Sequence, residues 1–165
     1  MSELRAPATS LLDRYEGTQI LPLYTAEVKV SGGSAGHARA SGTAKSSDGA
    51  LDVGLRLPKE LGGPGGGTNP EQLFAAGYAA CFHGALSLIA SKRKVRLTEV
   101  SIVAKVTFGR DPSDGLFMIT ADLEVELPGV DKDLATSLIE ETEAVCPYAK
   151  MSKRGFAGSI SLKAA

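Results

Sequence analysis

The stretch TNPEQLFAAGYAACF, residues 68–82, decides the fold more than any other part of this chain. Asn69 can cap a helix, Pro70 suits the first helical position, and Glu71 complements the positive end of the helix dipole. From Leu73 onwards almost every position is apolar or small. Because a helix that is apolar on all its faces must be covered on all of them, we predict a long buried helix at the centre of the protein.

Alternation of apolar and polar residues predicts short strands on both sides of this helix, separated by turns rich in glycine, serine and aspartate. The predicted strands are residues 24–30, 37–45 and 51–57 before the helix, and 99–109, 116–127 and 158–163 after it. Residues 131–146 predict a second helix, which Pro147 ends. This order of elements indicates an α+β fold, in which the helices cover mainly antiparallel sheet.

Length and composition favour one cytoplasmic globular domain. The chain has 165 residues, 43% of them hydrophobic and 22% charged, which is ordinary for a soluble protein. The net charge of −1 argues against a nucleic-acid partner. No secretory signal is apparent, and we expect no apolar stretch of membrane-spanning length because Lys92, Arg93 and Lys94 end the best candidate. We predict a loose N-terminal arm over residues 1–20 and a single domain over residues 21–165.

The two cysteines stand at marked positions. Cys81 lies inside the apolar helix, and Cys146 closes the second helix, where the dipole disfavours a thiolate. That position suits a thiol that attacks an oxidised sulfur better than one that attacks peroxide. In a reducing cytosol a bond between the two would more readily be transient and catalytic than structural. A free cysteine is also a common core residue, so two inert thiols remain an alternative.

The residues that share a helical stripe with Cys81 favour a functional role for this thiol. Glu71, Phe74, Tyr78 and Cys81 are spaced three, four and three apart, so they share one face of the helix. Ten residues of straight helix rise about 15 Å, so Glu71 cannot touch Cys81 directly. Three explanations stay open: a bend near Gly77, a bridging arginine, or a group from a second subunit.

A cation near Cys81 would favour its thiolate, and Arg39 is the candidate because it is the only cation between Lys29 and Lys45. A guanidinium would also present several donors to a peroxide oxygen. Other chemistries fit less well. The glycine-rich loop lacks the Gly-Lys-Ser/Thr ending of a phosphate-binding loop, and His37 and His83 form no closely spaced ligand pair for zinc.

The run GTNPEQLFAAGYAACF, residues 67–82, resembles the thiol peroxidases of the OsmC/Ohr family, specifically the organic hydroperoxide resistance branch. The similarity covers roughly residues 22–163. It includes LYTA at 23–26, SSDG at 46–49, ELGG at 60–63 and VCPY at 145–148.

The resemblance implies an OsmC-like fold and an intertwined homodimer with active sites at the subunit interface. It implies that Cys81 attacks the peroxide, that Cys146 resolves the product, and that an arginine–glutamate pair holds the thiolate. Glu71 matches the glutamate. The arginine expected directly after Gly-Gly is replaced by Ser34, so we assign its role to Arg39, the only arginine in that longer stretch.

The activity implied is reduction of alkyl or fatty-acid hydroperoxides through a Cys81 sulfenic acid and a Cys81–Cys146 disulfide. A dithiol such as dihydrolipoamide, carried on a lipoylated protein, would recycle the enzyme. We expect Phe74, Tyr78 and Phe82 to line an apolar substrate channel, and we expect no metal, flavin or haem. The alternatives are a peroxidase of the osmotically inducible branch and a redox-sensing module that does not turn over.

Overall fold

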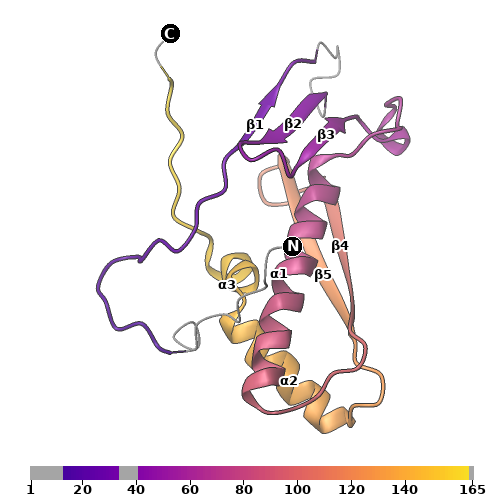
Figure 1. The fold of residues 1–165 in the computed structure, drawn as a ribbon. Coiled ribbons are helices and arrows are strands. Elements are labelled where there is room, and N and C mark those ends of the chain that lie inside the picture. Colours follow the sequence, from indigo (N-terminus) through magenta and orange to yellow (C-terminus); the bar gives the residue numbers. More distant parts are fainter. Residues whose placement is uncertain (1–12, 34–40, 164–165) are drawn as a thin grey trace.

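The computed structural model describes residues 13–33 and 41–163, and Figure 1 shows a long helix flanked by a small sheet, a hairpin and two further helices. The strands and helices follow one another along the chain as β1 (Val28–Ser31), β2 (Gly42–Ser46), β3 (Asp52–Leu55), η2 (Lys59–Leu61), α1 (Pro70–Lys92), β4 (Ser101–Arg110), β5 (Phe117–Glu126), α2 (Lys132–Val145) and α3 (Pro147–Arg154). The predicted α+β class with antiparallel sheets is confirmed.

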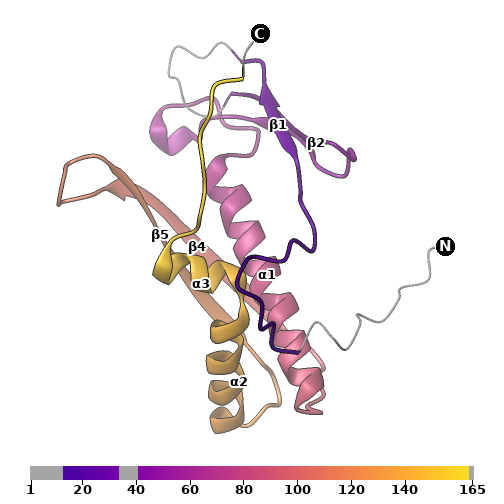
Figure 2. The same ribbon diagram turned by 90° about the vertical axis from the view of Figure 1, so that its left-hand side faces the viewer.

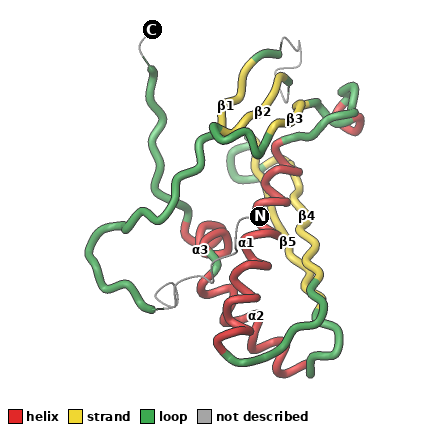
Figure 3. Tube along the Cα trace, viewed as in Figure 1, coloured by secondary structure: helices red, strands yellow, loops and turns green. Residues whose placement is uncertain are grey.

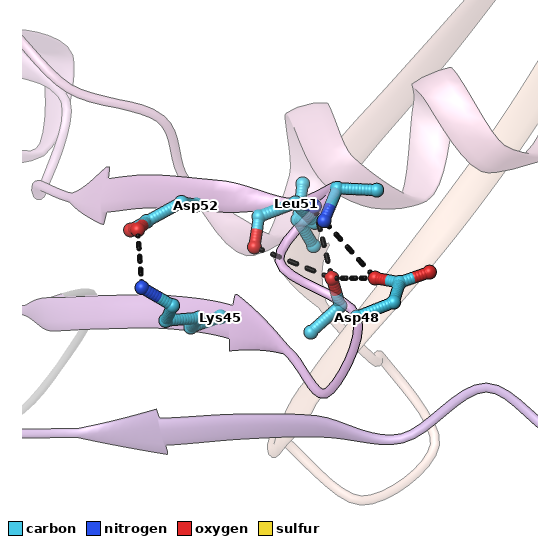
Figure 4. Close-up of polar contacts among 6 residues, drawn as sticks. Lys45, Asp48, Leu51 and Asp52 are labelled. Carbon is cyan, nitrogen blue, oxygen red and sulfur yellow. Dashed lines mark hydrogen bonds and ion pairs between the residues drawn. The ribbon is translucent and has the colours of Figure 1, made fainter.

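The first sheet is the predicted meander, with strand order β1-β2-β3 and antiparallel pairing throughout. Its strands are shorter than predicted, and residues 37–40 of the second one lie outside the described residues. The β2–β3 turn is held by Asp48, whose carboxylate accepts hydrogen bonds from the Ser46 hydroxyl and from the Ala50 backbone N–H (Figure 4). These bonds lower the pKa of Asp48. Lys45 and Asp52 pair across the strands at 2.9 Å.

The start of α1 is tied to this sheet. The Thr68 backbone N–H donates to the Gly54 carbonyl at 3.0 Å, and the Arg56 N–H donates to the Thr68 carbonyl at 2.8 Å. One residue later, the Asn69 side chain accepts the Gln72 backbone N–H at 2.9 Å. The predicted cap and the predicted first residue, Pro70, are therefore confirmed. This arrangement fixes where the helix that carries Cys81 begins.

The main core lies between α1, the β4–β5 hairpin and α2. The two strands pair from Ser101 opposite Glu126 to Arg110 opposite Phe117, within two residues of the predicted bounds. Leu86 of α1 and Leu138 of α2 have no exposed surface. Figure 2 shows the far end of the hairpin projecting beyond the helices.

Pro147 has a second role that the sequence analysis missed. It ends α2, as predicted, but it also begins α3. Proline has no N–H to lose at the first position of a helix, so one residue can stop one helix and start the next. Cys146 lies at this junction and has an extended backbone. It is both the C-cap residue of α2 and the N-cap residue of α3.

The predicted last strand is wrong for the chain described. Residues 155–163 form an extended segment without strand pairing (Figure 3), and Ile160 and Leu162 are 105% and 97% exposed. A strand requires a neighbouring strand to receive its hydrogen bonds. No described strand of this chain lies beside the segment in a ladder.

The prediction that α1 is buried on all sides is only partly met. Its buried residues are Tyr78, Phe82, Leu86, Ile89 and Ala90. The expectation that no apolar stretch reaches membrane-spanning length is wrong, because α1 has 23 residues and contains a window of mean hydropathy 1.6. Within the protein, 28% of that window is buried. The helix nevertheless packs against β4, α2 and α3, as the core helix of a folded domain does.

Candidate functional site

The two cysteines lie close together in space although their positions differ by 65 in the sequence. Cys81 Sγ, on α1, lies 3.4 Å from Cys146 Sγ, at the α2–α3 junction. Cys146 is fully buried, whereas Cys81 is partly exposed. A disulfide bond is about 2.05 Å long, so a small movement of either side chain would join the two sulfurs. The pair can therefore exchange between thiols and a disulfide without unfolding.

An apolar cluster surrounds the thiols. Its buried members are Tyr78, Phe82, Cys146 and Ala149, and partly buried side chains from α1, α2, α3 and both strands of the hairpin pack against them. Phe74, Tyr78 and Tyr148 form a group of three rings, with centroids 5.9 to 6.1 Å apart. We call this group the aromatic triad. It borders the thiols on the side of the α1 N-terminus.

Tyr148 was not among the predicted site residues. Its hydroxyl lies over Gly77, where a Cβ would stand only 3.1 Å from it, so the glycine leaves room for the phenol. The signal that could have found Tyr148 is its place in the Cys-Pro-Tyr sequence. A proline at the first position of a helix brings the next residue directly beside the capping cysteine.

Two opposing influences act on the Cys81 thiol. Burial is the larger and raises its pKa, while a hydrogen bond from the Tyr148 backbone N–H lowers it. The neighbouring Cys146 raises it further. On balance, the described surroundings disfavour the thiolate. A reactive Cys81 therefore needs a positive charge that these residues do not supply.

The predicted activators are placed less completely than the thiols. Arg39 lies outside the described residues. Glu71 occupies the first turn of α1, and it makes an interaction within the structure. The helix is continuous through Gly77. A bend near Gly77, a bridging arginine and a second subunit all stay predictions for how Glu71 acts on Cys81.

The predicted lining residues differ in exposure. Phe74 is partly buried, while Tyr78 and Phe82 are 7% and 4% exposed. A cavity of about 320 Å³ borders Tyr78 and Phe82 together with Leu123 and Ile139, but Cys81 does not line it. A larger cavity of about 490 Å³, at the C-terminal half of α1 and lined by His83 and Arg96 among others, contains neither cysteine. Phe74 is thus the most exposed of the three predicted lining residues.

The architecture and the paired thiols define a known class of protein. The family described as OsmC-like protein matches residues 63–160, more than half of the chain. The chain belongs to this family.

Its relatives carry names of the predicted branch. An organic hydroperoxide resistance protein of Xanthomonas axonopodis pv. citri is 45% identical over 142 residues, which are 85% of this chain and 94% of the relative. The organic hydroperoxide resistance protein OhrB of Bacillus subtilis is 38% identical over 87% of this chain and its own full length.

Solved structures of similar proteins support the same family assignment. The crystal structure of the Bacillus subtilis OhrB protein superposes with a TM-score of 0.69 at 38% identity, over 81% of this chain and 93% of that one. A putative organic hydroperoxide resistance protein of Vibrio cholerae, with captopril bound in one of its active sites, gives 0.73 at 33% identity, over 82% and 88%. The predicted family and branch are confirmed.

Proposed function

We propose that this protein reduces organic hydroperoxides to alcohols and that Cys81 is the attacking thiol. The observation that carries the proposal is the 3.4 Å separation of the two sulfurs inside an apolar cluster. The names of the relatives supply the class of substrate. Cys81 is the attacking member because it is partly exposed, whereas Cys146 is fully buried and cannot meet a substrate first.

The reaction proceeds in three balanced steps. The Cys81 thiolate attacks the distal oxygen of the hydroperoxide and breaks the O–O bond, and the leaving alkoxide takes a proton to become the alcohol. Cys146 then attacks the sulfur of the resulting sulfenic acid, forms the disulfide and releases water. A dithiol next reduces the disulfide by exchange and is itself oxidised to a disulfide. We assign this last role to the dihydrolipoamide of a lipoylated protein.

We also propose that Arg39 and Glu71 hold Cys81 as a thiolate. Burial raises the pKa of Cys81, so catalysis at neutral pH requires a nearby cation. A guanidinium placed between Glu71 and Cys81 would pair with the carboxylate and would lower the pKa of the thiol. Phe74, with Tyr78 and Phe82 behind it, would give an alkyl chain an apolar surface to bind.

We propose further that the working unit is a homodimer. Two extended segments, residues 13–27 and 155–163, contain no helix and no strand. Their most exposed large apolar side chains are Ile20 (91% exposed), Leu23 (74%), Tyr24 (80%), Phe156 (78%), Ile160 (105%) and Leu162 (97%). Extended apolar segments that pair with no described strand of their own chain are suited to pair with the strands of another. A second copy of this chain would cover them and the exposed faces of α1.

The test is peroxide consumption by the purified protein with cumene hydroperoxide and hydrogen peroxide, each supplied with a lipoyl or a thioredoxin reductant. We expect turnover with the organic peroxide and the lipoyl dithiol, and loss of that turnover in Cys81→Ser. A Cys81→Ser protein that consumes cumene hydroperoxide at the parent rate would refute the proposal. Disulfide formation without turnover by any dithiol would instead identify a redox-sensing module.

A further inference from the structure

The short helix α3 begins at the thiol pair, and its first turn has backbone N–H groups to offer. The first N–H groups of any helix have no acceptor within the helix. In α3, the Lys150 N–H is the first to bond internally, to the Cys146 carbonyl at 3.0 Å. Pro147 has no N–H, so the Tyr148 N–H is the first free donor, and a hydrogen bond from the Tyr148 backbone lowers the pKa of Cys81.

The Tyr148 ring packs against the helix that carries Cys81. The ring is the α3 member of the aromatic triad, with Phe74 and Tyr78 of α1 at 5.9 Å each. Its Oη and Cζ atoms would stand 3.1 and 3.5 Å from a Cβ on Gly77. The ring therefore lies against the bare backbone of α1, one turn before Cys81, and it fastens the start of α3 to the helix that carries the thiol.

We propose that Tyr148 is a positioning residue for Cys81: its ring, seated over Gly77, holds the first turn of α3 so that the Tyr148 backbone N–H donates to Cys81 Sγ. A hydrogen bond to sulfur is stronger when the sulfur is ionised, so the contact favours the thiolate. The same contact keeps Cys81 beside Cys146. This inference rests on the proposed function for the importance of the thiolate, but not for the geometry.

The other side chains of the cluster around Cys81 are mostly apolar and do not compete with this hydrogen-bond donor. From β4 and β5 the cluster receives Ile102, Ala121, Leu123 and Val125, and from α2 it receives Ile139. These side chains are all apolar. Within the described residues, the titratable groups of the cluster are the Cys146 thiol and the phenols of Tyr78 and Tyr148. A backbone donor counts for more among apolar neighbours than it would in water.

The experiment measures the pKa of Cys81 by its rate of alkylation with iodoacetamide over a pH series. All proteins carry Cys146→Ser, so that one thiol reacts. We expect Tyr148→Ala and Gly77→Ala to raise the Cys81 pKa by about one unit, and so to slow alkylation at neutral pH by about ten-fold. Tyr148→Phe keeps the ring and should retain the parent value.

Gly84→Ala is the matched control for Gly77→Ala. Gly84 also lies within α1, and a Cβ there meets no described atom within 4 Å. Both substitutions favour helix equally, but only Gly77→Ala should disturb Tyr148. A Cys81 pKa in folded Gly77→Ala equal to that in Gly84→Ala would overturn the proposal, whatever becomes of Tyr148→Ala. Because alkylation needs no peroxide, failure of the peroxidase proposal would be seen separately.

Discussion

The cysteine cluster and the two extended segments differ in how much of their apolar surface this chain covers by itself. The cluster draws side chains from α1, α2, α3 and both strands of the hairpin, and Cys146 at its centre has no exposed surface. The extended segments, residues 13–27 and 155–163, contain no helix and no strand (Figure 3). Their large apolar side chains are exposed.

This difference distinguishes the contacts that one chain makes by itself from the apolar surface that only a partner can cover. The two thiols approach to 3.4 Å through contacts inside a single chain, so their proximity requires no second copy of the chain. The apolar surface of the segments gains nothing in free energy until something covers it. A variant in the cluster should therefore change reactivity or folding, and a variant in the segments should change association.

The largest effect is expected at the buried thiol. Cys146→Ser should lower steady-state turnover by about three orders of magnitude, because the Cys81 sulfenic acid loses the thiol that stands 3.4 Å away. The first reaction with peroxide should survive, since Cys81 is untouched. Rapid-mixing measurement of one turnover, with mass spectrometry of the sulfenic acid, checks this. Loss of the first reaction as well would mean that Cys146 does more than resolve.

The next effect concerns the charge at Cys81. Arg39→Ala should leave the thiol with the raised pKa that burial imposes, so the fraction of thiolate at neutral pH falls by at least about ten-fold. The rate with peroxide should drop accordingly at neutral pH and recover as the pH rises through that pKa. The measurement is the pH profile of alkylation, with Arg39→Lys as the variant that keeps the charge. An unchanged profile would assign the role to another cation.

Removal of packing at the centre of the core should cost stability rather than reactivity. Leu138→Ala opens a cavity at a fully buried position and should lower the free energy of unfolding by about 2–5 kcal/mol. Val145→Ala, on the same helix at a side chain that is 51% exposed, should change it by less than about 0.5 kcal/mol. Urea denaturation of both variants makes the comparison. Equal losses would mean that Val145 is covered in solution.

The elements that could be predicted from sequence are those whose signals are local. The Asn69 cap, Pro70 at the first helical position and the alternation across β4 and β5 all act within a few residues or between neighbours in the chain. The residues near Cys81 likewise followed from helical spacing. The family resemblance then supplied the pairing with Cys146, which no local pattern contains.

The elements that failed depend on contacts that sequence spacing does not reveal. Residues 158–163 alternate as well as any strand of the hairpin, but alternation cannot say which strand lies alongside. α3 is not predicted, because a proline after a helical pattern signals the end of a helix as readily as the start of the next. The place of Tyr148 over Gly77 depends on α3 and is therefore not predicted either. The roles of Arg39 and Glu71 stay predictions, because the first lies outside the described residues.

The extended segments supply the test of association. Ile160→Asp should raise the dissociation constant of the proposed dimer by at least about a hundred-fold, because it would bury an unpaired carboxylate in the contact. Ser159→Asp adds the same charge on the opposite side of an alternating segment and should have little effect. Sedimentation of both variants over a range of concentrations is the measurement. A dimer equally stable in both variants would show that the C-terminal segment takes no part in it.

The smallest effect is expected at the first turn of α1, which links the two regions through the helix that carries Cys81. Asn69→Ala removes the side-chain oxygen that accepts the Gln72 N–H, and it should lower the free energy of unfolding by about 1 kcal/mol. Asn69→Ser keeps an acceptor and should recover most of that loss. Because the cap lies more than three helical turns from Cys81, the alkylation rate of the thiol should not change while the protein stays folded. A slower alkylation of Cys81 in Asn69→Ala, but not in Asn69→Ser, would show that fraying of this turn changes the surroundings of the thiol. The cluster would then depend on contacts outside its own packing.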